Sequence, residues 1–116
     1  MGPEQEWREA LGEGRFLLQR ARTSGRHFFP PRVAEPGSGS RDWEWVEASG
    51  DGTVYSATLV HPRPPEAPYN VVLVDLAEGP RIMGRVTGLE AVPIGLAVRA
   101  RIDVSGDEPL ILFDPT

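Results

Sequence analysis

Six short runs of β-forming residues fill the chain from residue 43 to its end, and they constrain the fold more than any other feature. The runs are WEWVEAS, GTVYSATLVH, YNVVLVDL, RIMGRVTG, LAVRARIDV and PLILFDPT, separated by turn-forming stretches such as SGDG and SGDEP. AVRARIDV alternates apolar and charged residues, as a strand with one buried face does. VVLVDL is apolar until Asp75, which predicts a strand covered on both faces. Because closing a sheet removes its exposed edges, the pattern predicts a small barrel over residues 43–116, with an OB-fold as the first candidate.

A helix and a less regular segment are expected before the barrel. In PEQEWREAL, Pro3 suits a first helical turn, and Trp7, Ala10 and Leu11 form a narrow apolar stripe. RFLLQRAR is expected to form a strand, whereas the two prolines of HFFPPRV exclude a regular central strand. The stretch AEPGSGSRD is typical of a linker. We therefore expect a mainly β protein with three parts: a short N-terminal helix (1–14), an irregular segment (15–42) and the barrel (43–116).

Two turn-like clusters lie in the irregular segment, at ARTSG and AEPGSGS, with aromatic residues and prolines between them. They have the outline of two knuckles of a metal-binding ribbon, but the chain has no cysteine, so no thiolate can bind a metal there. Five arginines and no acid occur between residues 15 and 32: Arg15, Arg20, Arg22, Arg26 and Arg32. Such a run is most often a solvated face, and the alternative is a site for phosphates or for an acidic partner.

Composition argues against several classes of protein. No apolar run approaches the roughly 18 residues that span a membrane, and the polar start MGPEQEWREA does not resemble a signal peptide. We therefore expect no membrane association, and the absence of cysteine favours a cytoplasmic protein. Nucleic-acid binding is not expected either, because residues 47–116 carry five arginines against ten acids.

Catalytic motifs are missing from the sequence. It contains no GxSxG, Walker or HExxH motif, and a cysteine nucleophile is impossible. His27 and His61 are the only imidazoles, and a histidine at a strand end before proline, such as His61, is more often structural. The sequence therefore favours a protein that is not itself an enzyme.

The order of several phrases resembles a known family. The phrases are LLQRARTSGRHFFPPR, WEWV, GDGTVYSATLVH, APYNVVLVDLAEGPRIMGRVTG, PIGLAVRARI and the terminal LILFDP. Over residues 8–116 the chain resembles acyl-CoA-associated OB-fold proteins that carry a rubredoxin-like zinc ribbon before the barrel. The resemblance implies a non-catalytic accessory subunit of a thiolase-superfamily enzyme (a thiolase, aldolase or acyltransferase) that acts on acyl-CoA thioesters. Such a subunit would dock on the enzyme and help to form the CoA site; the alternative is a freestanding module that binds acyl-CoA or another small ligand.

The resemblance also implies positions for four ribbon cysteines, and this chain has other residues at all of them: Ala21, Ser24, Glu35 and Ser38. Alanine offers no ligand atom and hydroxyls are poor zinc ligands. We therefore predict a degenerate ribbon without bound zinc or any other resident cofactor.

Contacts with ligand and partner follow from the same resemblance. The acid-free run predicts that Arg20, Arg22 and Arg26 face the phosphates of CoA. Contacts with the partner enzyme are predicted for a set of mainly aromatic and proline residues: Phe28, Phe29, Pro30, Pro31, His61, Tyr69 and Phe113.

Overall fold

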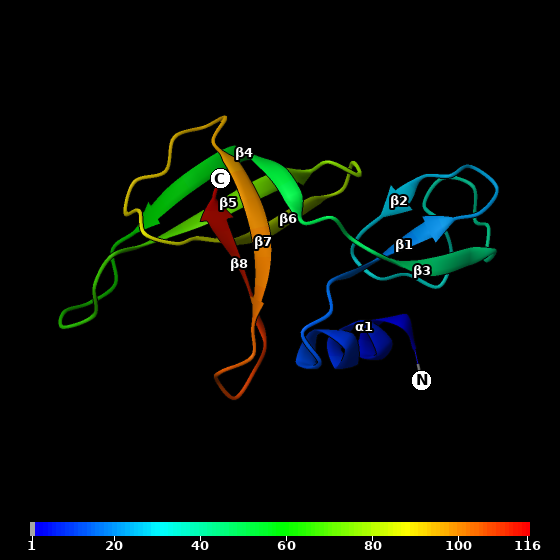
Figure 1. Ribbon diagram of the computed structural model, residues 1–116, viewed down its shortest axis with the longest axis horizontal. Helices are drawn as coiled ribbons and strands as arrows, with labels where there is room; N and C mark the ends of the chain where they lie inside the picture. The colour runs from blue at the N-terminus through cyan, green and yellow to red at the C-terminus, as the bar shows by residue number, and fades with distance from the viewer. Residues whose placement is uncertain (1) are drawn as a thin grey trace. The chain divides into compact units, whose positions relative to one another are not determined.

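The protein is described over residues 2–116 by a computed structural model, in which one helix precedes eight strands (Figure 1). The helix α1 (Pro3–Gly12) is followed by β1 (Leu17–Ala21), β2 (His27–Phe28) and β3 (Trp43–Glu47). The later strands are β4 (Asp51–Val60), β5 (Tyr69–Leu76), β6 (Arg81–Val86), β7 (Ala97–Asp103) and β8 (Leu110–Pro115). They form a three-stranded sheet and a closed barrel, which confirms the predicted mainly β fold class.

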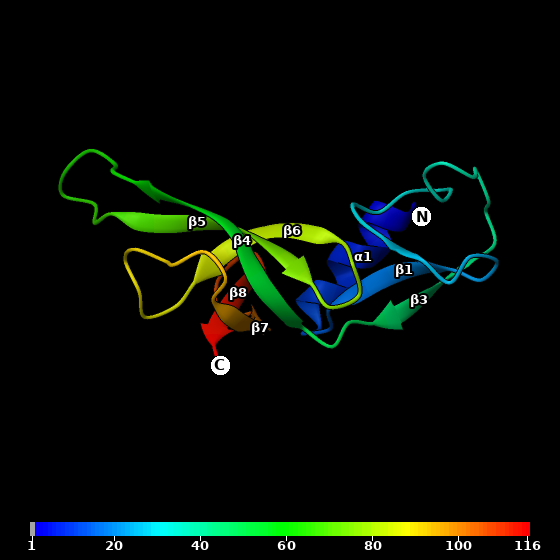
Figure 2. The same ribbon diagram turned by 90° about the horizontal axis from the view of Figure 1, so that it is seen from above.

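The barrel has the strand order β4–β5–β6–β8–β7 (Figure 2). β4 pairs antiparallel with both β5 and β7, while β6 and β8 run parallel. The register of β4 shifts between Val54 and Ser56, a β-bulge that leaves Tyr55 without an opposite residue on β5. Bulges increase the bend of a strand, which suits a long strand that closes a small barrel. The five-stranded barrel confirms the predicted OB-fold.

The barrel core is built from the inward residues of all five barrel strands: Val54, Val72, Val74, Leu76, Ile82, Val86, Val98 and Phe113. Phe113 has no exposed surface, so its predicted contact with a partner is wrong. In LILFDP the alternation places Phe113 inside, while its neighbours Leu112 and Asp114 are half-buried.

The burial pattern of β5 differs from the prediction of a strand covered on both faces. Its residues alternate between buried and half-buried along the whole strand. Asn70, Val72, Val74 and Leu76 point into the barrel, and the residues between them lie on the outer face. The continuous apolar run in the sequence therefore reflects an apolar outer face rather than a second covering layer.

The second sheet has the order β2–β1–β3. β3 pairs with β1 over its full length, from Leu17 opposite Glu47 to Ala21 opposite Trp43. The chain divides after residue 49 into two compact units, of which the first also includes residues 78–80 and 102–110. The predicted barrel start at residue 43 thus differs from the structure, because β3 pairs with β1 and not with a barrel strand. A strand's own composition does not specify which sheet it joins.

The helix packs through the predicted stripe. Ala10 and Leu11 are buried, and the Trp7 indole N–H donates a 2.9 Å hydrogen bond to the Leu17 carbonyl at the start of β1. Trp45 on β3 donates to the Glu6 carboxylate at 2.8 Å. In residues 2–116 no helix is both long and apolar enough to cross a bilayer.

Candidate functional site

The first of the two predicted knuckles is a tight turn at the end of β1. The Gly25 N–H donates to the Ala21 carbonyl at 2.8 Å, and the Ala21 N–H donates to the Arg26 carbonyl at 2.9 Å. The Ser24 hydroxyl accepts a third bond, from the Arg26 N–H at 3.2 Å. Gly25 has a φ of 76°, a left-handed conformation that favours glycine.

The second knuckle repeats these three bonds 14 residues later, with Glu35 in the place of Ala21. The Gly39 N–H donates to the Glu35 carbonyl at 2.9 Å, and the Glu35 N–H donates to the Ser40 carbonyl at 2.8 Å. The Ser38 hydroxyl accepts from the Ser40 N–H at 3.2 Å, and Gly39 has a φ of 72°. The two knuckles therefore share one local geometry, and we call the two turns together the paired-turn cluster (21–26 and 35–40).

The carboxylate of Glu35 lies between the two turns and is only 3% exposed. The Ser24 hydroxyl of the first turn donates to Glu35 Oε2 at 2.6 Å, and the Ser38 hydroxyl donates to Oε1 at 2.5 Å. Arg26 Nε lies 3.3 Å from Oε2. The hydrogen bonds from Ser24 and Ser38, together with the positive charge of Arg26, hold the pKa of Glu35 below its usual value against the opposing effect of burial.

Three of the four positions that resemble zinc-ligand positions, Ser24, Glu35 and Ser38, are joined by hydrogen bonds, and Ala21 lies in the same turn as Ser24, but the donor set does not fit zinc. Structural zinc sites use four deprotonated sulfur or nitrogen donors, or carboxylates, in a tetrahedron. Here Ala21 has no donor atom, and the hydroxyls of Ser24 and Ser38 are hydrogen-bond donors to the single carboxylate. No group of three or more metal-ligating side chains occurs among the described residues.

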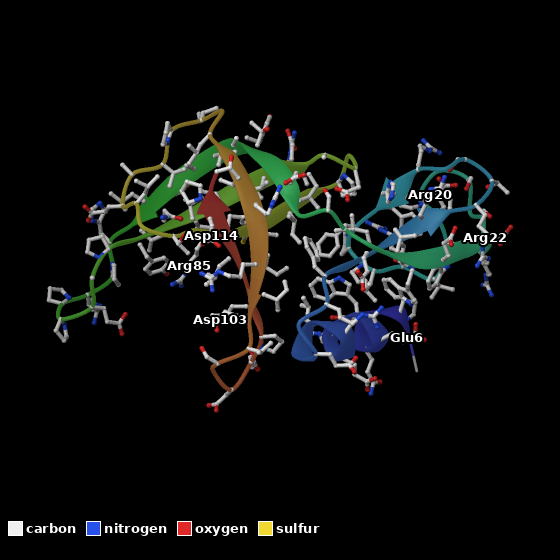
Figure 3. The ribbon with its side chains drawn as sticks, viewed as in Figure 1. Glu6, Arg20, Arg22, Arg85, Asp103 and Asp114 are labelled. Carbon is white, nitrogen blue, oxygen red and sulfur yellow. The ribbon has the colours of Figure 1, made fainter. Side chains whose placement is uncertain are left out.

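The arginines predicted to face phosphates are each paired with an acid. Arg20, on β1, and Arg22, just beyond its end, are labelled in Figure 3. Arg22 Nη1 lies 2.8 Å from Asp42, and Arg20 Nη1 lies 3.6 Å from Glu44 on the paired strand β3. The hydrogen bond to Asp42 is the main reason that the pKa of Arg22 lies above its usual value. Since Arg26 is paired with Glu35, a phosphate would have to compete with a carboxylate at all three side chains. Their contact with CoA stays a prediction.

The segment FFPPR is held by an amide that the sequence analysis did not identify. Gln19 on β1 is almost fully buried, and its side chain makes two hydrogen bonds with the backbone of Arg32. Gln19 Nε2 donates to the Arg32 carbonyl at 2.5 Å, and the Arg32 N–H donates to Gln19 Oε1 at 2.7 Å. The signal was present in the sequence, because a lone glutamine in the apolar run FLLQRA must find partners if it is buried.

The predicted contact residues of this segment lie in different environments. Phe28 is buried, and Phe29 packs on Trp7 with ring centroids 5.3 Å apart. Pro30 is exposed and Pro31 is half-buried. Pro30 is therefore the most accessible of the four, and Phe28 is a core residue.

The barrel presents a second candidate surface on the outside of β4, β5 and β6. We call it the outer barrel face, and it consists of Tyr55, Tyr69, Leu73, Arg81, Met83 and Arg85. Leu73 and Met83 are opposite each other on β5 and β6. Met83 is 63% exposed and Tyr55 is 51% exposed, so two large side chains of this face are accessible to a partner.

Two arginines stack on the tyrosines of the outer barrel face. The Arg81 guanidinium carbon lies 3.4 Å from the ring centroid of Tyr55, and that of Arg85 lies 4.0 Å from the ring centroid of Tyr69. Asp75 accepts a 2.6 Å hydrogen bond from Arg81 and is the main reason that the pKa of Arg81 is raised. Stacking fixes flat cationic groups beside an apolar strip, a combination typical of binding surfaces.

The remaining predicted contact residues, Tyr69 and His61, lie in different places. Tyr69 lies on the outer barrel face, whereas His61 is exposed at the end of β4. Asn70, next to Tyr69, points inward and is buried, where its amide bonds the backbone of Val86 and Leu89. The period-two pattern of β5 could have identified Asn70 as a buried polar residue, but Met83 carried no comparable signal.

Comparison with known proteins identifies the family to which the chain belongs. Residues 45–103 match the family described as "ChsH2, C-terminal OB-fold domain". A DUF35 domain-containing scaffold protein of Methanocaldococcus jannaschii is 31% identical over 119 residues, covering 94% of this chain and 84% of that protein. This chain belongs to the DUF35 family. The assignment confirms the resemblance to acyl-CoA-associated OB-fold proteins.

Solved structures extend the similarity of this DUF35 chain to nearly its whole length. A chain of the structure titled "Ltp2-ChsH2(DUF35) aldolase" superposes with a TM-score of 0.84 at 34% identity, covering 97% of this chain and 94% of that one. A DUF35 protein of unknown function from Sulfolobus solfataricus shares the fold, with a TM-score of 0.70 at 16% identity. A probable enoyl-CoA hydratase alpha subunit of Thermomonospora curvata is 39% identical over 97 residues, but this chain spans only 30% of its length.

Proposed function

We propose that this DUF35 chain is a non-catalytic accessory subunit of a thiolase-superfamily enzyme that acts on acyl-CoA thioesters. The observation that carries the proposal is the similarity over nearly full length to a chain of the Ltp2-ChsH2(DUF35) aldolase. The relatives named as a hydratase alpha subunit and as scaffold proteins support an assembly role in the same metabolism.

The outer barrel face is the surface that we assign to the partner enzyme. Tyrosine, methionine and arginine are enriched in protein–protein interfaces, and this face presents all three on a rigid sheet. Met83 and Leu73 would supply the apolar centre of the interface, and the stacked guanidinium groups of Arg81 and Arg85 would supply part of its polar rim.

We also propose that this chain contacts the acyl-CoA directly. A subunit that lies beside the active site can reach the long pantetheine and nucleotide parts of CoA without taking part in the chemistry. Arg20, Arg22 and Arg26 remain the predicted phosphate contacts, although their ion pairs would reduce the gain from each contact.

The test is co-expression of the full chain with a thiolase-superfamily enzyme encoded in the same genome. We expect the two proteins to co-elute in size-exclusion chromatography, and Met83→Asp to abolish co-elution because it places a charge at the apolar centre of the face. Ile94→Asp is the matched control, since Ile94 is also exposed on the barrel but lies in the loop before β7.

The outcomes test the accessory role and the assignment of the outer barrel face separately. Co-elution that survives Met83→Asp but is lost with Ile94→Asp would keep the accessory role and contradict the assigned face. A chain that stays alone with every candidate enzyme and binds acetyl-CoA unaided in calorimetry would instead support a freestanding acyl-CoA-binding module.

A further inference from the structure

In the paired-turn cluster, side-chain contacts join the two turns as a bound metal ion would, although the side chains present are not a set of metal ligands. We propose that the Glu35 carboxylate joins the two turns in place of a zinc ion, so that this chain folds without a structural metal. The proposal concerns how the first unit is held together and does not depend on the identity of the partner enzyme.

Two side chains of the first turn reach the Glu35 carboxylate of the second turn: Ser24 by a hydrogen bond and Arg26 by an ion pair. Ser24 belongs to the first turn and Glu35 to the second, 11 residues later, and the donor–acceptor distance is 2.6 Å. The bond from Ser38 lies within the second turn and fixes the orientation of the same carboxylate. Each oxygen of Glu35 thus has one hydroxyl donor, and hydrogen bonds to a carboxylate are shorter and stronger than those between neutral groups.

The direction of these bonds is set by the backbone. Ser24 and Ser38 each accept a bond from the N–H two residues later, at 3.2 Å in both turns. A hydroxyl that accepts a backbone bond still has its proton available, and an ionised carboxylate can only accept. The serines therefore connect the backbone of both turns to one charged group, as ligands connect a chain to a metal.

The charge of the cluster is balanced within the protein. The guanidinium group of Arg26, from the first turn, lies 3.3 Å from the same oxygen that accepts the bond of Ser24. Ala21, the fourth position, is fully buried and contributes only a methyl group. No buried side-chain nitrogen or oxygen in residues 2–116 lacks a hydrogen-bond partner, so the cluster needs no ion to satisfy it.

The first experiment measures the metal content and the melting temperature of the purified full chain. We expect less than about 0.1 zinc per chain by elemental analysis, since a structural site is essentially fully loaded at its high affinity. The melting temperature should not change with excess EDTA or with added zinc chloride. About one zinc per chain, or a marked loss of stability in EDTA, would overturn the proposal.

Variants test whether Glu35 is the link. Glu35→Gln removes the charge at nearly constant shape, and we expect the melting temperature of the full chain to fall by about 5 °C or more. Glu108→Gln, at an exposed glutamate of the same unit, is the matched control. If Glu35→Gln does not fold, Ser24→Ala and Ser38→Ala each remove one donor and should each lower the melting temperature. Unchanged melting temperatures in these variants would contradict the role of the carboxylate.

Cysteines placed at the four positions test whether a zinc ion can join the same two turns that Glu35 joins in this chain. The variant A21C/S24C/E35C/S38C should take up about one zinc per chain, and its melting temperature should become sensitive to EDTA. A folded variant that takes up no zinc would show that the turns do not form a metal-sized site. That result would overturn the proposal that Glu35 takes the place of a zinc ion.

Discussion

The ring of Phe113 lies directly against the backbone of Gly84. A β-carbon added at Gly84 would come within 2.6 Å of Phe113 Cε2 and within 3.2 Å of the Ile111 carbonyl oxygen. β6 and β8 pair in parallel beside this contact, with Arg85 opposite Leu112. Glycine at residue 84 therefore gives the aromatic ring the space that it occupies in the barrel core.

Gly84→Ala is expected to destabilise the barrel by about 1–3 kcal/mol, because the ring or β8 must move to accommodate the methyl group. Denaturant unfolding followed by fluorescence measures the change. Gly106→Ala is the control, since a β-carbon there has 4.0 Å to its nearest atom, and it should change the free energy of unfolding by less than about 0.5 kcal/mol. Equal effects of the two substitutions would argue against the close packing.

Asn70→Ala should destabilise the barrel by about 3 kcal/mol. The amide of Asn70 accepts from the Val86 N–H at 2.8 Å and donates to the carbonyls of Val86 and Leu89 at 2.9 and 2.7 Å. Removing it leaves two buried backbone groups of Val86 and the part-buried Leu89 carbonyl without this partner. Thr58→Ala, at an exposed residue of β4, serves as the control in the same unfolding measurement. A loss below about 1 kcal/mol would mean that water replaces the amide.

Gln19→Leu should release the backbone of residue 32 while leaving the apolar packing of β1 in place. The Arg32 N–H then loses its 2.7 Å bond, and its hydrogen exchange should accelerate by roughly tenfold or more. Exchange at Gly25, whose N–H bonds the Ala21 carbonyl, is the internal reference and should change little. Acceleration at both amides alike would indicate general unfolding instead of a local release.

The contribution of Glu35 to the stability of the folded chain should be lost at low pH. The pKa of Glu35 is lowered in the folded protein by its two serine donors and by Arg26, so the unfolded chain binds the proton more tightly. The contribution is therefore complete above the unfolded pKa of about 4.3 and is lost as the pH falls through the lower folded pKa. The stability difference between wild type and Glu35→Gln should be constant from pH 7 to pH 6 and shrink below about pH 4. A difference that persists unchanged at pH 3 would contradict an ionised carboxylate.

The barrel could be predicted from the sequence because each of its strands is marked by local features. Turn residues bound every run, and the alternation in VRARIDV is strict. The assignment of WEWV to the barrel failed for a different reason. Its partner, β1, lies more than 20 residues earlier, and the pairing depends on register between distant residues, which local composition does not encode.

The candidate site shows the same division between local and distant information. The positions of Ala21, Ser24, Glu35 and Ser38 follow from the resemblance, and the structure joins the last three by hydrogen bonds. The ion pairs of Arg20 with Glu44 and of Arg22 with Asp42 depend on the pairing of β1 with the later strand β3, which the acid-free run alone does not specify. The exposure of Met83 depends on which face of β6 the barrel encloses, and RIMGRV alone does not specify it.

The Gln19 amide fixes the backbone of Arg32, yet the side chain of Arg32 is exposed. Because the chain has no cysteine, Arg32→Cys would create a single thiol at this rigid point. A maleimide dye attached there would sit on backbone that is hydrogen-bonded to β1, and it would find no other thiol in the chain. Residue 32 is therefore an attachment point from which the approach of another protein could be followed by fluorescence anisotropy or energy transfer.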